Sequence, residues 1–176
     1  MRHNRKREEY CILYRSNFQS RVLEESLREA KLPYRVIGGK SFFERKEIRD
    51  ALAYLKLIQN PNDLVSLQRV INTPRRGIGK TSLMQLNACV AETSLPVLKI
   101  MSQARKYSSI PAEAASSMEV FSALLGDFQG RFEKGNLGEV FRELLDELGY
   151  LRFLEQQSGD VKSRERRIQV VQELLR

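Results

Sequence analysis

The chain has 176 residues, of which 41% are hydrophobic, enough for one hydrophobic core and part of a second. Its 30 lysines and arginines outnumber its 22 aspartates and glutamates, so the formal net charge is +8 at pH 7. Cys11 and Cys89 are far apart and His3 is the single histidine, which excludes a disulfide framework and a metal site. No nucleophile or acid/base pair stands out, so we expect no catalytic residue, no metal and no cofactor in this chain.

Signals for secretion or membrane insertion are missing from the sequence. No apolar run approaches the roughly 18 residues that a membrane span requires. The basic segment from Met1 to Arg7 has no apolar segment after it, unlike a signal peptide. We therefore expect a soluble, cytoplasmic protein without a membrane partner.

The positive charge is concentrated in the first part of the chain. Residues 1–110 carry 21 basic and 10 acidic side chains, a net of +11, whereas residues 111–176 carry 9 basic and 12 acidic side chains, a net of −3. This asymmetry predicts that a polyanion, such as a nucleic acid, binds the first two-thirds. A solvated basic surface without a partner is the alternative.

The N-terminal segment has the pattern of a small β-α-β unit. Short apolar runs at Tyr10–Tyr14 and Tyr34–Ile37 predict two buried strands. Ser16 or Asn17 can cap the helix between them, and Pro33 ends it. Its expected core-facing residues follow the helical period: Val22, Leu23, Leu27 and Ala30. Because two strands alone are not a stable sheet, we expect residues 1–39 to be a fragment of a larger sheet domain.

Helical patterns dominate from residue 40 to the end. Apolar side chains recur at helical spacing in successive segments, separated by Asn60-Pro61, Thr73-Pro74, Pro96, Pro111 and Asn136. The last of these helices is expected to begin at about Ser163 and to bury Ile168, Val171, Leu174 and Leu175. The predicted fold is therefore mainly α, with a helical domain at residues 40–176 after the small β-α-β fragment.

Residues Gly77-Ile78-Gly79-Lys80-Thr81 resemble a Walker A loop, but the match fails. The motif needs a glycine five positions before Gly79, where this chain has Pro74. A helical pattern also precedes the loop, whereas a Walker loop follows a strand. A nucleotide site is therefore not expected here.

The same residues fit the turn of a helix-hairpin-helix element. Gly77 and Gly79 allow a tight turn and close approach of a phosphate, while Ile78 anchors the turn in the core. The N–H groups that open the next helix, at Thr81 or Ser82, form an anion site, and the basic residues around it add charge. Those basic residues are Arg75, Arg76 and Lys80. Such a turn binds phosphates without reading bases, and the alternative is a plain interhelix turn with exposed arginines.

An ordered series of segments resembles the C-terminal half of UvrD/Rep/PcrA-type superfamily 1 DNA helicases. The resemblance covers about residues 10 to 176. It is carried by Ile12-Leu13-Tyr14-Arg15-Ser16-Asn17, Gln19-Ser20-Arg21, Leu23-Glu24-Glu25, Pro33-Tyr34-Arg35-Val36, Gly38-Gly39, Phe42-Phe43-Glu44-Arg45, Glu47-Ile48-Arg49-Asp50, Leu52-Ala53-Tyr54-Leu55, Asn72-Thr73-Pro74-Arg75-Arg76-Gly77-Ile78-Gly79, Gly149-Tyr150, Leu154-Glu155 and Arg167-Ile168.

The resemblance implies a parent enzyme that uses ATP and Mg²⁺ to move 3′ to 5′ on single-stranded DNA and unwind a duplex. Residues 1–39 would belong to its second RecA-like motor domain, and residues 40–176 to the helical insertion called subdomain 2B. The residues that would grip the duplex backbone near the fork junction are Thr73, Arg75, Arg76, Gly77, Ile78, Gly79, Lys80 and Thr81. Arg15, Ser16 and Asn17 would touch single-stranded DNA.

The chain departs from the family pattern in lacking the Walker motifs and the later motor motifs, so it should not hydrolyse ATP alone. Phe18 stands where a small residue is expected before Gln19, which puts the geometry around Asn17 in question. The expected partners are DNA and the remaining helicase domains. A protein-interaction module, in which the acidic helices after residue 111 dock the motor or a repair protein, is the competing hypothesis.

Overall fold

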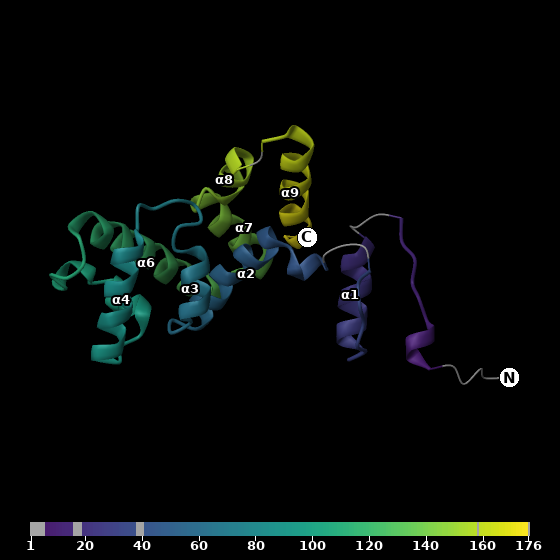
Figure 1. The fold of residues 1–176 in the computed structure, drawn as a ribbon, viewed down its shortest axis with the longest axis horizontal. Helices are drawn as coiled ribbons and strands as arrows, with labels where there is room; N and C mark the ends of the chain where they lie inside the picture. Colours follow the sequence, from purple (N-terminus) through teal and green to yellow (C-terminus); the bar gives the residue numbers. More distant parts are fainter. Residues whose placement is uncertain (1–5, 16–18, 38–40, 158, 176) are drawn as a thin grey trace. The chain divides into compact units, whose positions relative to one another are not determined.

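The structure is a computed structural model that describes residues 6–15, 19–37, 41–157 and 159–175. The chain forms two compact units, Met1–Arg45 and Lys46–Arg176, which are described separately (Figure 1). Most of the described residues are helical, which confirms the mainly α prediction. The domain boundary expected after residue 39 falls on residues 38–40, outside the described residues, and the assignment of residues 1–39 and 40–176 to two domains stays a prediction.

The first unit contains α1 (Gln19–Glu29) and two short 3-10 helices, η1 (Arg7–Glu9) and η2 (Phe42–Glu44). No strand occurs in its described residues, so the expected β-α-β fragment is not formed here. The runs Tyr10–Tyr14 and Tyr34–Ile37 are irregular and have no ladder partner, and a strand needs one for its backbone hydrogen bonds. Leu13 and Ile37, expected in a core, are 91% and 82% exposed.

The buried face of α1 differs from the expected one. Val22 is 62% exposed, because no sheet covers it among the described residues, whereas Glu24 is buried. The Glu24 carboxylate accepts hydrogen bonds from the Ser41 hydroxyl, from the Phe42 N–H at 3.0 Å and from the Tyr34 hydroxyl at 2.9 Å. Burial raises the pKa of Glu24, but these hydrogen bonds outweigh it and hold the pKa below its usual value. A buried carboxylate, not an apolar stripe, therefore ties α1 to η2.

The second unit is built of helices around α2. Its elements are α2 (Lys46–Gln59), α3 (Leu64–Val70), α4 (Lys80–Thr93), α5 (Val97–Met101), η3 (Ala104–Lys106), α6 (Ala112–Lys134), α7 (Leu137–Glu147), α8 (Tyr150–Gln157) and α9 (Val161–Leu174). Helix α2 packs against α3, α6 and α9. The helix at α8 was not expected from the sequence, and α9 begins at Val161 rather than at about Ser163.

Side-chain caps fix where several helices begin. The carboxylate of Asp63 accepts the N–H of Ser66 at 2.9 Å and starts α3. Asn136 caps α7 as the sequence predicts, and Asp160 caps α9. Each cap satisfies N–H groups that a first helical turn leaves without partners.

Aromatic rings fill the centre of the second unit. The ring of Tyr54 on α2 packs edge-on against Phe121 of α6 and Tyr150 of α8, with both centroid distances 6.2 Å. All three side chains are almost completely buried. Such edge-to-face pairs add to the stabilisation that burial of the rings already provides.

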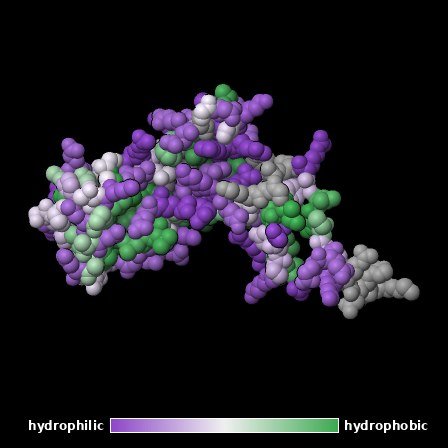
Figure 2. Space-filling view, viewed as in Figure 1, coloured by the Kyte–Doolittle hydropathy of each residue, from purple (hydrophilic) through white to green (hydrophobic). Residues whose placement is uncertain are grey.

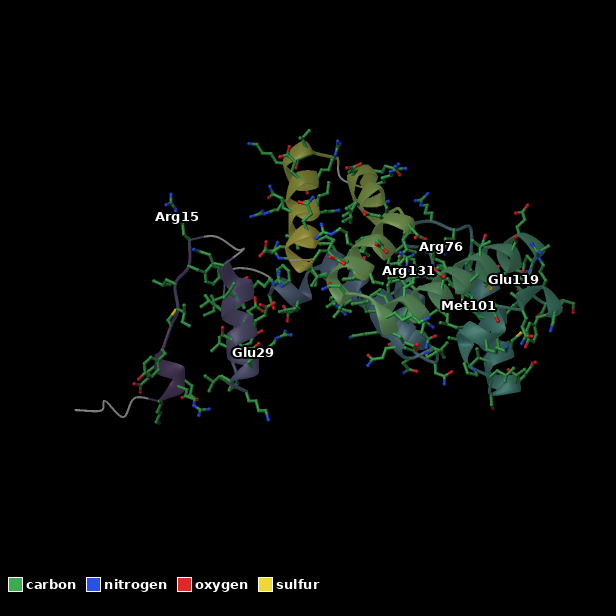
Figure 3. The ribbon with its side chains drawn as sticks, turned by 180° about the vertical axis from the view of Figure 1, so that it is seen from behind. Arg15, Glu29, Arg76, Met101, Glu119 and Arg131 are labelled. Carbon is green, nitrogen blue, oxygen red and sulfur yellow. The ribbon has the colours of Figure 1, made fainter. Side chains whose placement is uncertain are left out.

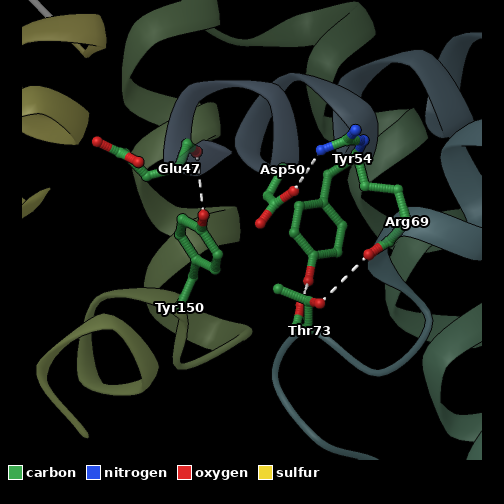
Figure 4. A network of polar contacts seen from close by, with 6 residues as sticks. All are labelled: Glu47, Asp50, Tyr54, Arg69, Thr73 and Tyr150. Carbon is green, nitrogen blue, oxygen red and sulfur yellow. Dashed lines mark hydrogen bonds and ion pairs between the residues drawn. The ribbon is translucent and has the colours of Figure 1, made fainter. Parts of the chain in front are cut away.

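A polar network runs through this core and holds the chain after α3 (Figure 4). Arg69 Nη1 lies 2.8 Å from Asp50 Oδ1, and Thr73 Oγ1 donates to the Arg69 carbonyl at 3.2 Å. The Tyr54 hydroxyl donates to the Thr73 carbonyl. The hydroxyl of Tyr150 donates to the carbonyl of Glu47 at 3.0 Å. Helix α2 therefore fixes both the turn after α3 and the start of α8.

The described residues offer neither a membrane span nor a metal site. No described helix is long and apolar enough to cross a membrane. No group of three or more His, Cys, Asp or Glu side chains is arranged to hold a metal ion in the described part of the chain.

Candidate nucleic-acid interface

The segment between α3 and α4, residues 71–79, is held in shape by Asn72. Its Oδ1 accepts the N–H groups of Arg76 and Ile78, both at 3.2 Å, and its Nδ2 donates to the Ile78 carbonyl. One side chain thus closes a loop of seven residues. We call residues 72–79 the glycine turn.

The glycine turn is also fastened from inside by Arg76, which is labelled in Figure 3. Its Nη1 donates to the carbonyls of Val70, Ile71 and Pro74 at 2.8, 3.0 and 3.2 Å. The first two lie at the C-terminal end of α3, where carbonyls lack helical partners and a cation is favourable. The guanidinium of Arg76 therefore stabilises the turn, and its assignment to phosphate binding stays a prediction.

The structure explains why each position of Gly77-Ile78-Gly79 carries the residue that it does. Gly77 has a φ of +72°, a left-handed conformation that side chains rarely adopt. Ile78 is 2% exposed, which confirms that it anchors the turn in the core. Gly79 is the N-cap of α4, and a Cβ built on either glycine meets nothing within 4 Å. The protein surface above both glycines is therefore open.

The outer surface of the glycine turn continues into the first turn of α4. Arg75, Gly77, Gly79, Lys80 and Thr81 are exposed. Because the N-cap is a glycine, no side chain caps this helix, and its first N–H groups remain available to a ligand. The 14-residue α4 directs its positive end here, where Arg75 and Lys80 add two charges. An anion approaching this surface meets backbone donors and cations together.

The structure therefore separates the eight residues that the sequence assigned to duplex binding. Arg75, Gly77, Gly79, Lys80 and Thr81 lie on the exposed surface. Arg76 and Ile78 point inward and shape the turn, and Thr73 bonds to α3 and to Tyr54. Helices flank the turn on both sides as expected, while its assignment as a helix-hairpin-helix element stays a prediction.

The residues assigned to single-stranded DNA belong to the first unit. Arg15, labelled in Figure 3, is exposed, and its backbone N–H donates to Gln19 Oε1 at 3.0 Å. Ser16 and Asn17 lie outside the described residues. Their role stays a prediction.

The sequence interpretation missed a groove beside the glycine turn. It has a volume of about 540 Å³ and lies between Pro74 and Arg75 on one side and α8 on the other. Arg152, Phe153, Gln156 and Gln157 line it from α8, and Leu148 and Gly149 from the chain just before that helix. The signal that could have revealed α8 was the apolar spacing of Tyr150, Leu151 and Leu154, directly after a glycine suited to end α7.

Comparison with known proteins identifies the chain's relatives. The UvrD-like helicase C-terminal domain family matches residues 1–176. The ATP-dependent DNA helicase PcrA of Bacillus subtilis is 37% identical over 161 residues, which are 91% of this chain and 22% of that protein. DNA helicase II of Salmonella typhimurium is 45% identical over 115 residues, 65% of this chain and 16% of that protein.

PcrA of Staphylococcus aureus is 34% identical over 157 residues, 89% of this chain and 21% of that protein. The chain thus spans about a fifth of the length of these relatives. Since the family match covers every residue and agrees with the segments that carry the resemblance, the chain belongs to the UvrD-like helicase C-terminal domain family.

Proposed function

We propose that the glycine turn and the first turn of α4 bind the phosphate backbone of duplex DNA within a DNA helicase. The observation that carries this proposal is the uncapped positive end of α4, exposed between Arg75 and Lys80. The open space above Gly77 and Gly79 lets a phosphate approach the backbone closely.

The proposed role is that of one portion of a larger enzyme. The relatives named above are DNA helicases, and PcrA is described as ATP-dependent. In the whole protein, ATP and Mg²⁺ would act in the remaining helicase domains, which are this chain's proposed partners. Residues 1–39 would complete the second motor domain, with Arg15, Ser16 and Asn17 near single-stranded DNA. Residues 40–176 would form the insertion that holds the duplex at the fork junction.

Binding through this surface should not depend on DNA sequence. Backbone N–H groups and cations recognise phosphates, which are the same in every base pair. Each neutralised phosphate releases condensed counterions, so affinity falls with salt by about 0.9 logarithmic units per contact for each tenfold rise in salt. The number of phosphate contacts can therefore be obtained from the salt dependence of the affinity, without a structure of the complex.

The test is the affinity of the 176-residue chain for a fluorescent duplex at about 50 and 200 mM salt. In a plot of the logarithm of affinity against the logarithm of salt concentration, the slope counts phosphate contacts. The double variant Arg75→Gln/Lys80→Gln should make this slope shallower by about 1.8, since two contacts are lost. The salt-induced loss of affinity over this range should then be roughly tenfold smaller than in the wild type. Two duplexes of unrelated sequence should give the same result.

Lys106→Gln is the matched control, because Lys106 is an exposed cation on η3 outside the glycine turn. It removes one charge from the chain and should leave the slope unchanged. A double variant that behaves like this control would exclude the glycine turn from the contact. Wild-type protein that fails to bind duplex at the lower salt would refute the proposal altogether.

A second candidate is docking of a basic protein partner on the acidic face of α6 and α7. There Arg131, labelled in Figure 3, is surrounded by the carboxylates of Asp127, Glu143 and Glu147. An apolar area over α3 and α4, where Val65 and Met84 are 80% and 72% exposed, offers further contact surface (Figure 2). Binding of purified motor domains in the presence of nuclease, lost on reversing Glu143 and Glu147 to Lys, would support this candidate.

A further inference from the structure

We propose that the groove between the glycine turn and α8 holds a second stretch of the duplex backbone, with Arg152 as its phosphate-binding residue. In Figure 1 the chain between α3 and α4 rises toward α8, and the lining of the groove comes from both. The inference rests on the proposed function, because it extends the same phosphate contact from α4 to a later helix.

The charge of the groove is positive and unneutralised. Arg75 and Arg152 both line it, both are exposed, and neither guanidinium forms an ion pair within the described residues. None of the lining residues is acidic, and the one acidic residue of α8, Glu155, is not among them. Two like charges facing one groove repel each other, and an anion between them removes that repulsion.

The remaining lining fits a nucleic-acid backbone better than an isolated ion. Gln156 and Gln157 bring amide groups that can donate hydrogen bonds to phosphate oxygens. Pro74, Leu148 and Phe153 supply apolar surface, against which the carbon face of a deoxyribose can pack. A guanidinium also matches a phosphate better than an ammonium does, since it donates two parallel hydrogen bonds.

The position of the groove is fixed by buried contacts on both sides. On the α8 side the ring of Phe153 stacks on Tyr150, whose hydroxyl donates to the Glu47 carbonyl of α2. On the turn side the Thr73 carbonyl accepts the Tyr54 hydroxyl, also from α2. Both walls are therefore held by the same central helix, and Arg75 and Arg152 are presented by a rigid frame.

The experiment measures the salt slope of duplex binding for Arg152→Gln, Arg152→Lys, Lys80→Gln and the control Lys106→Gln. Arginine, lysine and glutamine have similar helix propensities, so α8 should remain folded, and circular dichroism verifies this. We expect Arg152→Gln to lower the slope by about 0.9, an effect of about 3.5-fold between 50 and 200 mM salt. Arg152→Lys should keep the slope, because its charge is retained, yet bind more weakly.

The outcomes separate this inference from the proposed function. If Arg152→Gln matches the control while Lys80→Gln lowers the slope, the groove is excluded and the glycine turn remains. If Arg152→Gln lowers the slope while Lys80→Gln does not, Lys80 is excluded from the contact, and duplex binding passes through the groove that Arg75 of the glycine turn shares with Arg152. If Arg152→Gln weakened the binding of single-stranded DNA but not of duplex, the assignment of the groove to duplex DNA would be overturned.

Discussion

The guanidinium of Arg76 lies over the ring of Phe121, 4.0 Å from its centroid, while its Nη1 donates to three carbonyls around the end of α3. One side chain therefore joins α6, α3 and the glycine turn. Arg75, its neighbour in sequence, makes no hydrogen bond or ion pair within the described residues and faces solvent. Two adjacent arginines thus have opposite roles, one internal and one external.

Substitution of these two arginines should separate stability from binding. Arg76→Ala removes charge-assisted hydrogen bonds and a cation–π contact, and should lower the free energy of unfolding by about 2–4 kcal/mol. Arg75→Ala should change it by less than about 0.5 kcal/mol, as is usual for an exposed site, but weaken duplex binding. Urea denaturation followed by circular dichroism measures the first effect. Equal stability of the two variants would show that the Arg76 contacts contribute nothing.

Loss of Arg69 should produce a pH-dependent defect through Asp50. The Asp50 side chain is 4% exposed, and burial raises its pKa even though Arg69 lies 2.8 Å away. Arg69→Met leaves this carboxylate buried without its partner, at a cost of about 3 kcal/mol at pH 7. Arg69 lowers the pKa of Asp50, so its loss raises that pKa further above the unfolded value. Protonation then favours the folded state more in the variant than in the wild type, and the loss of unfolding free energy should shrink as the pH falls toward 4.

The double variant Asp50→Asn/Arg69→Met is the control for that experiment. It has no titrating group at position 50, so its difference from Arg69→Met should be largest at pH 7 and smallest near pH 4. Urea midpoints at several pH values give the comparison. A deficit of Arg69→Met that stays constant with pH would rule out the buried carboxylate as its cause.

The stability that the N-cap of α3 contributes should depend on pH in the opposite direction. Hydrogen bonds from the hydroxyl and the N–H of Ser66, at 2.6 and 2.9 Å, hold the pKa of Asp63 below its usual value. Asp63→Ala should cost about 1 kcal/mol at pH 7. The contribution of Asp63 is complete above its unfolded pKa and is lost as the pH falls through the lower folded pKa. The difference between wild type and variant should therefore shrink below about pH 4, whereas Asp63→Asn should retain most of the cap.

The two glycines of the turn should respond differently to alanine. Gly77→Ala places a side chain at a φ of +72° and should cost about 1–2 kcal/mol, although no atom obstructs the added methyl group. Gly79 has a φ of −72°, which alanine adopts freely, so Gly79→Ala should cost less than about 1 kcal/mol. Thermal and urea unfolding of both variants test the difference. Equal costs would mean that the left-handed conformation of Gly77 is not required.

Local sequence rules predicted most of the helical unit because its signals are local. Asn136 and the prolines before α5 and α6 mark helix starts, and Ile78 could be placed in the core from its position between two glycines. The direction of Arg76 could not be predicted. It depends on Phe121, 45 positions later in the sequence, whose ring is brought there by the packing of α6 against α2.

The prediction of two strands was wrong for a related reason: it also depended on distant parts of the chain. Tyr10–Tyr14 has a strand-like composition, but a strand exists only through hydrogen bonds to a neighbour, and none forms in the described residues. The groove beside the glycine turn could not be predicted from local sequence either, since Arg75 and Arg152 lie far apart in the chain. Only the tertiary arrangement brings the two side chains to one surface.

The hydrogen bond from Tyr150 to Glu47 joins residues 103 positions apart, and α9 packs on the same helix α2. During synthesis at about 5–20 residues per second, α2 would leave the ribosome many seconds before these partners exist. Helix α3 follows directly and can pack on α2 early, but the part of α2 that contacts α8 and α9 stays uncovered through that interval, when chaperones have access to it. The first helix of this unit to be made is thus among the last to be fully enclosed.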